Sequence, residues 1–160
     1  MGYTVGFGKH KDKTFEWLFF NDPGYVRWMI DEDVARKFNR FMRNRFEGLV
    51  RQAMNLEVPG KCQYCDRPIS MMCLTKDTSG KLAQVDFLCD KCPGTGGSRS
   101  LLTEPAFLIP ESFRSYNDKG GDKVLADSIK YAYYGKDVQM SEEEMEEFFE
   151  EPSNFALSFI

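Results

Sequence analysis

Four of the five cysteines stand in two pairs, each with two residues between its cysteines: Cys62/Cys65 and Cys89/Cys92. Two sulfurs three positions apart on a tight turn can face one point, and two such turns supply the four thiolates of a structural zinc site. We therefore predict structural Zn²⁺, with an iron centre and disulfide bonds as alternatives. A redox pair is not favoured, because neither pair opens a helix behind a strand. Four thiolates fill the coordination sphere, so the metal should stabilise the fold and not activate water.

The segment between the two pairs alternates apolar and polar residues, which predicts a β-hairpin. Its strands are expected near residues 69–76 and 81–88, with the turn at 77–80. This hairpin would bring the two cysteine turns together as a zinc ribbon. Cys73 falls in the first strand, where a small buried residue is expected. Zinc ribbons bind nucleic acids and proteins alike, so the ribbon alone does not indicate the partner.

A second candidate site lies in a turn near the N-terminus. Lys9, Lys11 and Lys13 alternate through this turn. A strand is predicted before it, at residues 4–7, and a short helix after it, capped by the hydroxyl of Thr14. Lysines on a turn can neutralise phosphate groups, so a nucleic acid is a candidate partner.

Aromatic residues crowd the segment that follows the turn. Trp17, Tyr25 and Trp28 could stack on unpaired bases, each stack contributing about 1–3 kcal/mol. The same rings could equally form the core, because a small domain needs large apolar side chains. His10, the only histidine, is expected to be an exposed turn residue.

Two helices are predicted after the turn and its short helix. Asp22 followed by Pro23 marks the start of the first, and Asp31 can cap a longer helix that ends near Leu56. At about 100° per residue, the longer helix has an apolar face and an opposite cationic face. The predicted apolar face holds Val34, Phe38, Phe41, Met42, Phe46, Leu49 and Ala53. The cationic face holds Arg51 and four predicted contacts to nucleic acid, Arg36, Lys37, Arg40 and Arg43.

The stretch FGKHKDKTFEWLFFNDPGYVRWMI, which begins at Phe7, resembles a known family. Its pattern F-G-K-x-K-x-x-T, then D-P-x-Y-x-x-W, is met at Phe7, Gly8, Lys9, Lys11, Thr14, Asp22, Pro23, Tyr25 and Trp28. The pattern is similar to the small C-terminal module of exodeoxyribonuclease X, which also occurs alone in bacterial and phage proteins. It covers about a fifth of the chain, residues 3–32, and Asp12 stands where that family usually has glycine. The resemblance implies an accessory, nucleic-acid-associated module, without the nuclease part and its metal-binding carboxylates.

The charge is distributed unevenly along the chain. The net charge is -4, yet residues 137–160 contain eight acidic and no basic residues, which leaves +4 on residues 1–136. This layout indicates two different partners, or an acidic segment that shields the basic part from its ligand. A solvated, charged helix is the simpler alternative.

The C-terminal segment is predicted to be helical. Asp122 can cap one helix, which Gly135 closes, and Ser141 with Glu144 forms a capping-box pattern for a final acidic helix. The mixture of glutamates and apolar residues resembles the acidic, hydrophobic-tipped tails of single-stranded DNA-binding proteins. A packed terminal helix and mimicry of DNA remain alternatives. The predicted partner-binding residues are Phe148, Phe149 and Phe159.

The motifs of common enzymes are missing or incomplete. There is no second histidine and no G-x-S-x-G, and GTGGSRS lacks the Lys-Ser/Thr ending of a phosphate-binding loop. We therefore predict no catalytic residues, with a metal-dependent nuclease as the remaining enzymatic alternative. No apolar run is long enough to cross a bilayer and no secretory signal is present, so a cytoplasmic location without membrane contact is expected.

Together these patterns predict an α+β protein with three parts. Residues 1–57 form the module with its basic helix, residues 58–100 the zinc ribbon, and residues 101–160 a strand and helix region with the acidic segment. The predicted function is a non-catalytic, zinc-stabilised accessory protein of bacterial or phage type that binds nucleic acid, DNA rather than RNA. The alternative is a protein-binding adaptor or inhibitor that acts through the acidic segment.

Overall fold

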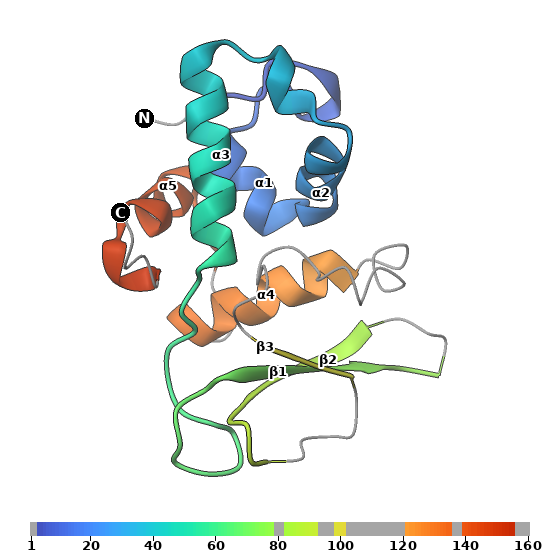
Figure 1. Cartoon of the computed structure of the whole chain (residues 1–160), viewed down its shortest axis with the longest axis vertical. Helices are drawn as coiled ribbons and strands as arrows, with labels where there is room; N and C mark the ends of the chain where they lie inside the picture. Colours follow the sequence, from blue (N-terminus) through green and yellow to red (C-terminus); the bar gives the residue numbers. More distant parts are fainter. Residues whose placement is uncertain (1–2, 79–81, 93–97, 102–120, 136–138, 156–160) are drawn as a thin grey trace.

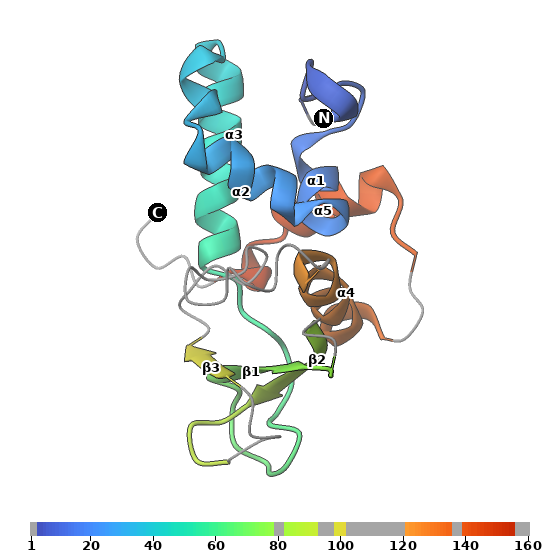
Figure 2. The ribbon, with the colours of Figure 1, turned by 90° about the vertical axis from the view of Figure 1, so that its right-hand side faces the viewer.

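The computed structural model describes residues 3–78, 82–92, 98–101, 121–135 and 139–155. It confirms the predicted α+β class. The helices are α1 (Phe15–Asn21), α2 (Pro23–Asp31), α3 (Arg40–Met54), α4 (Gly121–Tyr134) and α5 (Glu142–Glu150). In Figure 1, α1, α2, α3 and α5 gather at one end, the sheet lies at the other, and α4 lies between them. Figure 2 shows the same order after a quarter turn.

The N-terminal segment forms a tight turn and not the predicted strand. A single bridge joins Thr4 to Thr14, and a short 3-10 helix, η1 (Gly8–His10), fills the turn between them. The amide of Val5 donates to the carbonyl of Lys13 at 2.8 Å. Because the chain turns back immediately, too few residues remain for a strand on either side.

Both predicted starts of the next two helices are confirmed. The Thr14 hydroxyl accepts a hydrogen bond from the amide of Trp17, which caps α1. The Asp22 carboxylate accepts one from the amide of Tyr25, with Pro23 in the first turn of α2. These caps satisfy amides that have no partner inside the helix.

The predicted helix from Asp31 to Leu56 is wrong, because the chain breaks it into separate elements. Asp31 is the last residue of α2, and a short 3-10 helix, η2 (Val34–Lys37), follows. Asp33 adopts a left-handed conformation, with φ 50°, which stops α2 from continuing. Asn39 then caps α3 by accepting a hydrogen bond from the amide of Met42 at 2.9 Å.

This break changes which residues of the predicted apolar face are buried. Phe46, Leu49 and Ala53 are buried in the core, as predicted. Phe41, which was predicted to join them, is 69% exposed. In α3 it lies about 140° around the helix axis from Phe46, on the side away from the core.

The three strands β1 (Met71–Lys76), β2 (Leu82–Leu88) and β3 (Ser98–Leu101) form an antiparallel sheet in the order β2-β1-β3. The hairpin of β1 and β2 confirms the prediction. One sheet face, with Met72, Leu74 and Phe87, joins the main core. The other face, with Cys73 and Leu88, packs with the paired cysteines.

Helix α4 connects the sheet to the N-terminal helices, because it contacts both β2 and α1. It begins at Gly121, one residue before the predicted cap. Gly135 closes it as predicted, with φ 92° and an amide that donates to the carbonyl of Tyr131 at 2.8 Å. Within the described ranges, no helix has both the length and the apolar character that a bilayer crossing requires.

Helix α5 has the predicted capping box between Ser141 and Glu144. A short 3-10 helix, η4 (Pro152–Asn154), follows α5. Phe148 and Phe149, predicted to face a partner, are each only 2% exposed. The ring centroid of Phe148 lies 5.2 Å from that of Phe20, and the centroid of Phe149 lies 5.2 Å from that of Phe19. The prediction for these two residues is wrong, because burial against α1 removes their rings from the surface.

Candidate metal centre and candidate nucleic-acid interface

The four paired cysteines meet as predicted. Their sulfurs all lie within 4.8 Å of one another, and the Cys65 and Cys89 sulfurs are 3.6 Å apart. A tetrahedral zinc site with Zn–S bonds of about 2.3 Å has sulfurs about 3.8 Å apart, so the thiol set fits a metal ion. All five cysteines are free thiols. Cys73 is fully buried and lies outside this set of four.

Local backbone structure positions the first cysteine pair. The amide of Cys62 donates to the carbonyl of Arg67 at 2.9 Å, which closes the loop between Lys61 and Pro68. The side-chain oxygen of Gln63 accepts a hydrogen bond from the amide of Phe87 at 2.9 Å. The first cysteine turn is therefore fixed to β2, the strand that leads directly into Cys89.

Backbone amides point at the sulfurs. The amide of Tyr64 donates to Cys62 Sγ and that of Arg67 to Cys65 Sγ, each at 3.5 Å. Burial alone would raise the pKa of the Cys89 thiol, but hydrogen bonds from backbone amides and from the Cys92 and Cys65 thiols together outweigh burial and lower it to about 6. Such donors stabilise negative charge on sulfur, the form in which cysteine binds metal.

The turn lysines and the aromatic residues come together on one surface. The ammonium of Lys9 lies 5.6 Å from the ring centroid of Tyr25, and that of Lys13 lies 5.0 Å from the ring centroid of Trp17. Lys11 is exposed on the same turn. Trp28 is 45% exposed, and its ring centroid lies 5.2 Å from that of Tyr25. Trp17 and Tyr25 both pack partly against the core, so Trp28 is the most exposed of the three rings.

His10 was predicted to be exposed, and this prediction is wrong. Its ring lies between those of Trp17 and Tyr25, with centroid distances of 5.2 and 5.0 Å. Its Nε2 donates to Asp22 Oδ2 at 2.8 Å, and the ammonium of Lys9 reaches the same oxygen at 3.0 Å. Burial would raise the pKa of the Asp22 carboxyl, but hydrogen bonds from His10 and Lys9 outweigh burial and lower it. The position of Asp22 before Pro23 indicated only a helix cap.

The glycine of this turn fits against Tyr25. Gly8 has φ 67°, and a Cβ at this position would lie 2.5 Å from the Tyr25 hydroxyl oxygen. Any larger residue would be strained in its backbone and would overlap with the Tyr25 hydroxyl. Asp12 needs no such conformation, since Asp33 is the non-glycine with positive φ in the described ranges.

The predicted cationic face of the longer helix is divided between two elements. Arg36 and Lys37 are exposed on η2, and Arg40 is exposed at the start of α3. Arg43 points elsewhere: its guanidinium donates to the carbonyls of Ala35 and Arg36, at 3.1 and 2.6 Å. It therefore holds η2 against α3, and its donors are less available to a phosphate.

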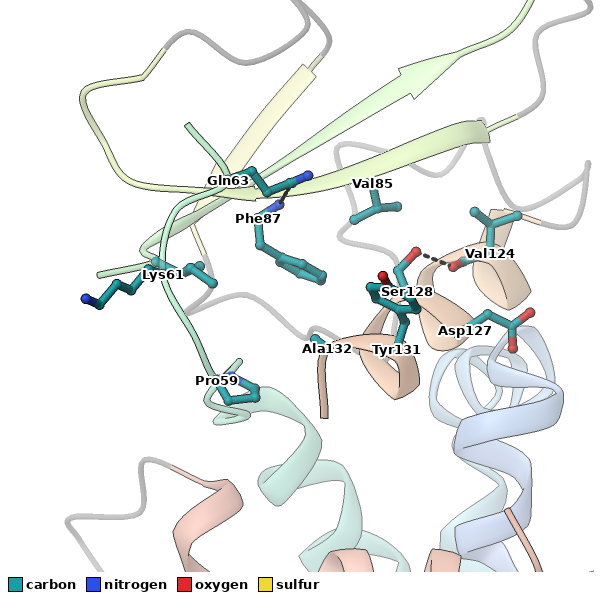
Figure 3. A pocket seen from close by; sticks show the side chains of 11 residues that line it. Pro59, Lys61, Gln63, Val85, Phe87, Val124, Asp127, Ser128, Tyr131 and Ala132 are labelled. Atoms are coloured by element: carbon teal, nitrogen blue, oxygen red, sulfur yellow. Dashed lines mark hydrogen bonds between the residues drawn. The ribbon is translucent and has the colours of Figure 1, made fainter. Parts of the chain in front are cut away.

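A cleft of about 570 Å³ separates the ribbon from α4. Figure 3 shows Val85 and Phe87 on the β2 side of this cleft and Val124 on the α4 side. Two of its polar residues bond to other groups of α4: the Ser128 hydroxyl donates to the Val124 carbonyl, and Asp127 pairs with two lysines. These bonds do not place a nucleophile beside a base.

The structure thus supports two of the predicted groupings. The four metal ligands meet at one point, and the turn lysines share a surface with Tyr25 and Trp28. The sequence patterns placed Phe41, His10, Phe148 and Phe149 wrongly, and Phe159 lies outside the described residues. No protein-family model, curated protein or solved structure matches this chain.

Proposed function

We propose that the chain is a zinc-stabilised, non-catalytic accessory protein that binds nucleic acid through the surface around η1. One observation carries the proposal: Lys9 and Lys13 extend over aromatic rings, and their side chains are 66% and 43% exposed. Ammonium groups beside accessible rings suit a ligand that offers both phosphates and bases.

The proposed mechanism divides the work between two kinds of side chain. Lys9, Lys11 and Lys13 contact phosphates. The electrostatic contribution of these contacts to the affinity does not depend on the base sequence and decreases as the salt concentration rises. Tyr25 and Trp28 stack on unpaired bases, so single-stranded DNA is the preferred ligand. Gly8 and the bond from His10 to Asp22 hold the backbone of the turn in place, so the turn itself needs little ordering when the ligand binds.

The role proposed for zinc is structural. Four thiolates saturate the ion, so it supplies folding free energy to the ribbon and leaves no position for a substrate. The ribbon has few buried residues of its own on the cysteine side, Cys62, Cys73, Leu88 and Cys89. A cross-link by the metal is the natural stabiliser of such a small core.

The resemblance of residues 3–32 to the exodeoxyribonuclease X module agrees with this proposal. All nine of its pattern positions lie in η1 and its flanks (Phe7, Gly8, Lys9 and Lys11), at the caps of α1 and α2 (Thr14 and Asp22) or in α2 (Pro23, Tyr25 and Trp28). The pattern therefore describes a turn built to hold lysines beside rings. It indicates an accessory role, because no nuclease carboxylates accompany it.

Binding of labelled oligonucleotides to the zinc-loaded chain tests the proposal. Fluorescence anisotropy at about 50 mM and about 200 mM salt should show binding to single-stranded DNA that weakens with salt. Lys9→Glu with Lys13→Glu should weaken it about tenfold or more. Trp28→Ala should weaken it about fivefold or more through the lost stack.

Two control variants make the same kinds of change, a charge reversal and the removal of a ring, at positions away from η1. Arg51→Glu reverses a charge near the far end of α3, and Tyr131→Ala removes a 59% exposed ring from α4. Both should change the affinity less than about twofold, since neither residue lies near η1. If single-stranded DNA, duplex DNA and single-stranded RNA all fail to bind at the lower salt, the proposed function is rejected.

A further inference from the structure

A cavity of about 480 Å³ lies between the C-terminal end of α4 and the helix α5. Its size is within the range of pockets that hold small molecules or single side chains. Two kinds of residue dominate its lining: the aromatic Tyr133, Tyr134 and Phe148, and the acidic Glu144, Glu147 and Glu151. The cavity is remote in sequence from both sites described above.

The aromatic rings form firm walls. The ring centroids of Tyr133 and Phe148 are 4.8 Å apart and perpendicular, and Tyr134 lies 6.4 Å from Phe148. The Tyr133 hydroxyl donates to the backbone carbonyl of Glu57, which fixes that ring. Tyr134 is 46% exposed, so its ring stands at the mouth of the cavity.

The carboxylates differ in what they already bind. Glu144 uses one oxygen in the capping box with Ser141, and Glu151 uses one on Ser153. The Glu147 carboxylate makes neither a hydrogen bond nor an ion pair with the described residues, although the backbone carbonyl of Glu147 accepts from the amide of Glu151. Burial, and then the charges of Glu144 and Glu147, raise the pKa of Tyr134, which agrees with carboxylates facing that ring.

We propose that this cavity binds the cationic side chain of a partner protein, an arginine or a lysine, between its aromatic walls and its carboxylates. A cation over an aromatic face is attracted by the ring, and a carboxylate at its edge accepts its N–H donors. Of the lining residues that the structure describes, none is basic, so the negative charge is available to a ligand.

The surroundings of the cavity favour a basic segment of protein over a free organic cation. Glu143 and Glu150 are exposed on the same helix, outside the cavity. They extend the negative surface beyond the space that a single side chain fills. A protein segment that places one cationic side chain in the cavity and further positive residues against the acidic surface beside it matches both the cavity and that surface. This inference specifies the protein-binding role predicted for the acidic segment, and it does not depend on nucleic-acid binding.

Nuclear magnetic resonance titration of the full zinc-loaded chain tests the proposal without any nucleic acid. The probes are short capped peptides with a central arginine, lysine or citrulline, the last being a neutral copy of arginine, and spermidine as a free cation. The arginine and lysine peptides should shift the ring signals of Tyr133 and Tyr134 and the methyl signal of Met140, which also lines the cavity. The citrulline peptide should bind about tenfold more weakly than the arginine peptide, or not at all.

Two variants with matched controls locate the binding. Glu147→Gln and Tyr134→Leu should each weaken the arginine peptide about threefold to thirtyfold. Glu143→Gln on the same helix and Tyr131→Leu on α4 make the same changes outside the cavity and should alter affinity less than about twofold. Deletion of residues 137–160 is unsuitable, because it would remove the buried Phe148 and Phe149.

Three results would overturn the proposal. Equal binding of arginine and citrulline peptides would show a merely apolar cavity. Equal effects of the cavity variants and their controls would show diffuse attraction to α5. Binding of spermidine without binding of either cationic peptide would make the ligand a free cation and not a protein side chain. A chain that binds no DNA but passes this test would reject only the proposed function.

Discussion

The ammonium of Lys13 lies 3.4 Å from the carboxylate of Glu142, although 129 positions separate the two residues in the chain. The contact joins the turn proposed to bind phosphate to the first turn of the acidic helix α5. The side chains are 43% and 46% exposed, so the ion pair is weak and open to competition. An acidic segment that covers part of the basic surface was one of the sequence interpretations, and the ion pair of Lys13 with Glu142 is a contact of that kind.

We expect Glu142→Gln to tighten binding of single-stranded DNA by about two- to threefold. The change frees Lys13 and removes a negative charge from the edge of the proposed surface. Anisotropy titration at low salt measures the effect. Glu143→Gln makes the same charge change and is the control; an equal gain in both variants would mean that net charge, and not the contact with Lys13, is responsible.

Loss of a predicted metal ligand should unfold the ribbon. Cys62→Ser removes one of four thiolates, and the small core on the cysteine side cannot replace the metal. We expect one zinc ion per chain in the wild type and much less in the variant, measured by mass spectrometry of the metal content. The amide signals of β1 and β2 should lose their dispersion in the variant or after chelation.

Cys73→Ala is the control for this prediction. Cys73 is buried but lies outside the four sulfurs, so this variant should retain its zinc while losing some packing. If it loses the metal as completely as Cys62→Ser, the assignment of the four ligands is wrong.

Gly8→Ala should destabilise the protein more than Gly6→Ala. Both glycines have positive φ, but an added Cβ meets nothing within 4 Å at Gly6 and the Tyr25 hydroxyl at 2.5 Å at Gly8. Gly6→Ala should therefore lower the free energy of unfolding by about 1–2 kcal/mol, through backbone strain alone. Gly8→Ala should cost a further 1–3 kcal/mol or so from the overlap, about the range for overpacking.

A double variant separates strain from overlap at Gly8. Tyr25→Phe removes the hydroxyl that the new Cβ would meet, so it should recover part of the loss caused by Gly8→Ala but none of the loss caused by Gly6→Ala. Urea unfolding of Gly6→Ala, Gly8→Ala, Tyr25→Phe, the two double variants and the wild type provides the comparison. Equal losses for the two glycine variants would contradict the contact between Gly8 and Tyr25.

The contribution of the Tyr133 hydroxyl to the stability of the fold should decrease at alkaline pH. Burial, and then the charge of Glu57, raise the pKa of Tyr133 above its ordinary value of 10.0. The folded state therefore keeps the proton, and the resulting stability is complete below pH 10 and is lost as the pH rises above it. Tyr133→Phe should lower the free energy of unfolding by about 1 kcal/mol at pH 8, through the lost hydrogen bond.

Between pH 8 and pH 11 the difference between wild type and Tyr133→Phe should shrink or reverse. Urea unfolding at both pH values measures it. Tyr131→Phe, at a ring that is 59% exposed, controls for the general effect of alkali. A constant difference between wild type and Tyr133→Phe would show that the hydroxyl is not held protonated by the fold.

The sequence by itself determined the features that depend on neighbouring residues. The hairpin of β1 and β2, the caps at Thr14, Asp22 and Ser141, and the spacing of the four cysteines are set by short-range geometry. A hydroxyl or carboxylate before a helix finds its amide three residues away in any context. Two cysteines three positions apart likewise face one point wherever the turn lies.

Only the tertiary structure decided which aromatic rings are buried and which charged side chains have a partner within the protein. Phe41 and Phe46 belong to one predicted apolar face, but a break at Asp33 and a new cap at Asn39 leave the first exposed and the second buried. Phe148 lies among glutamates in sequence and is buried because α5 packs on α1. His10, in a charged turn, is enclosed because α2 brings Asp22 and Tyr25 against it. These contacts join residues from different elements, and a local sequence pattern does not predict which elements will lie against each other.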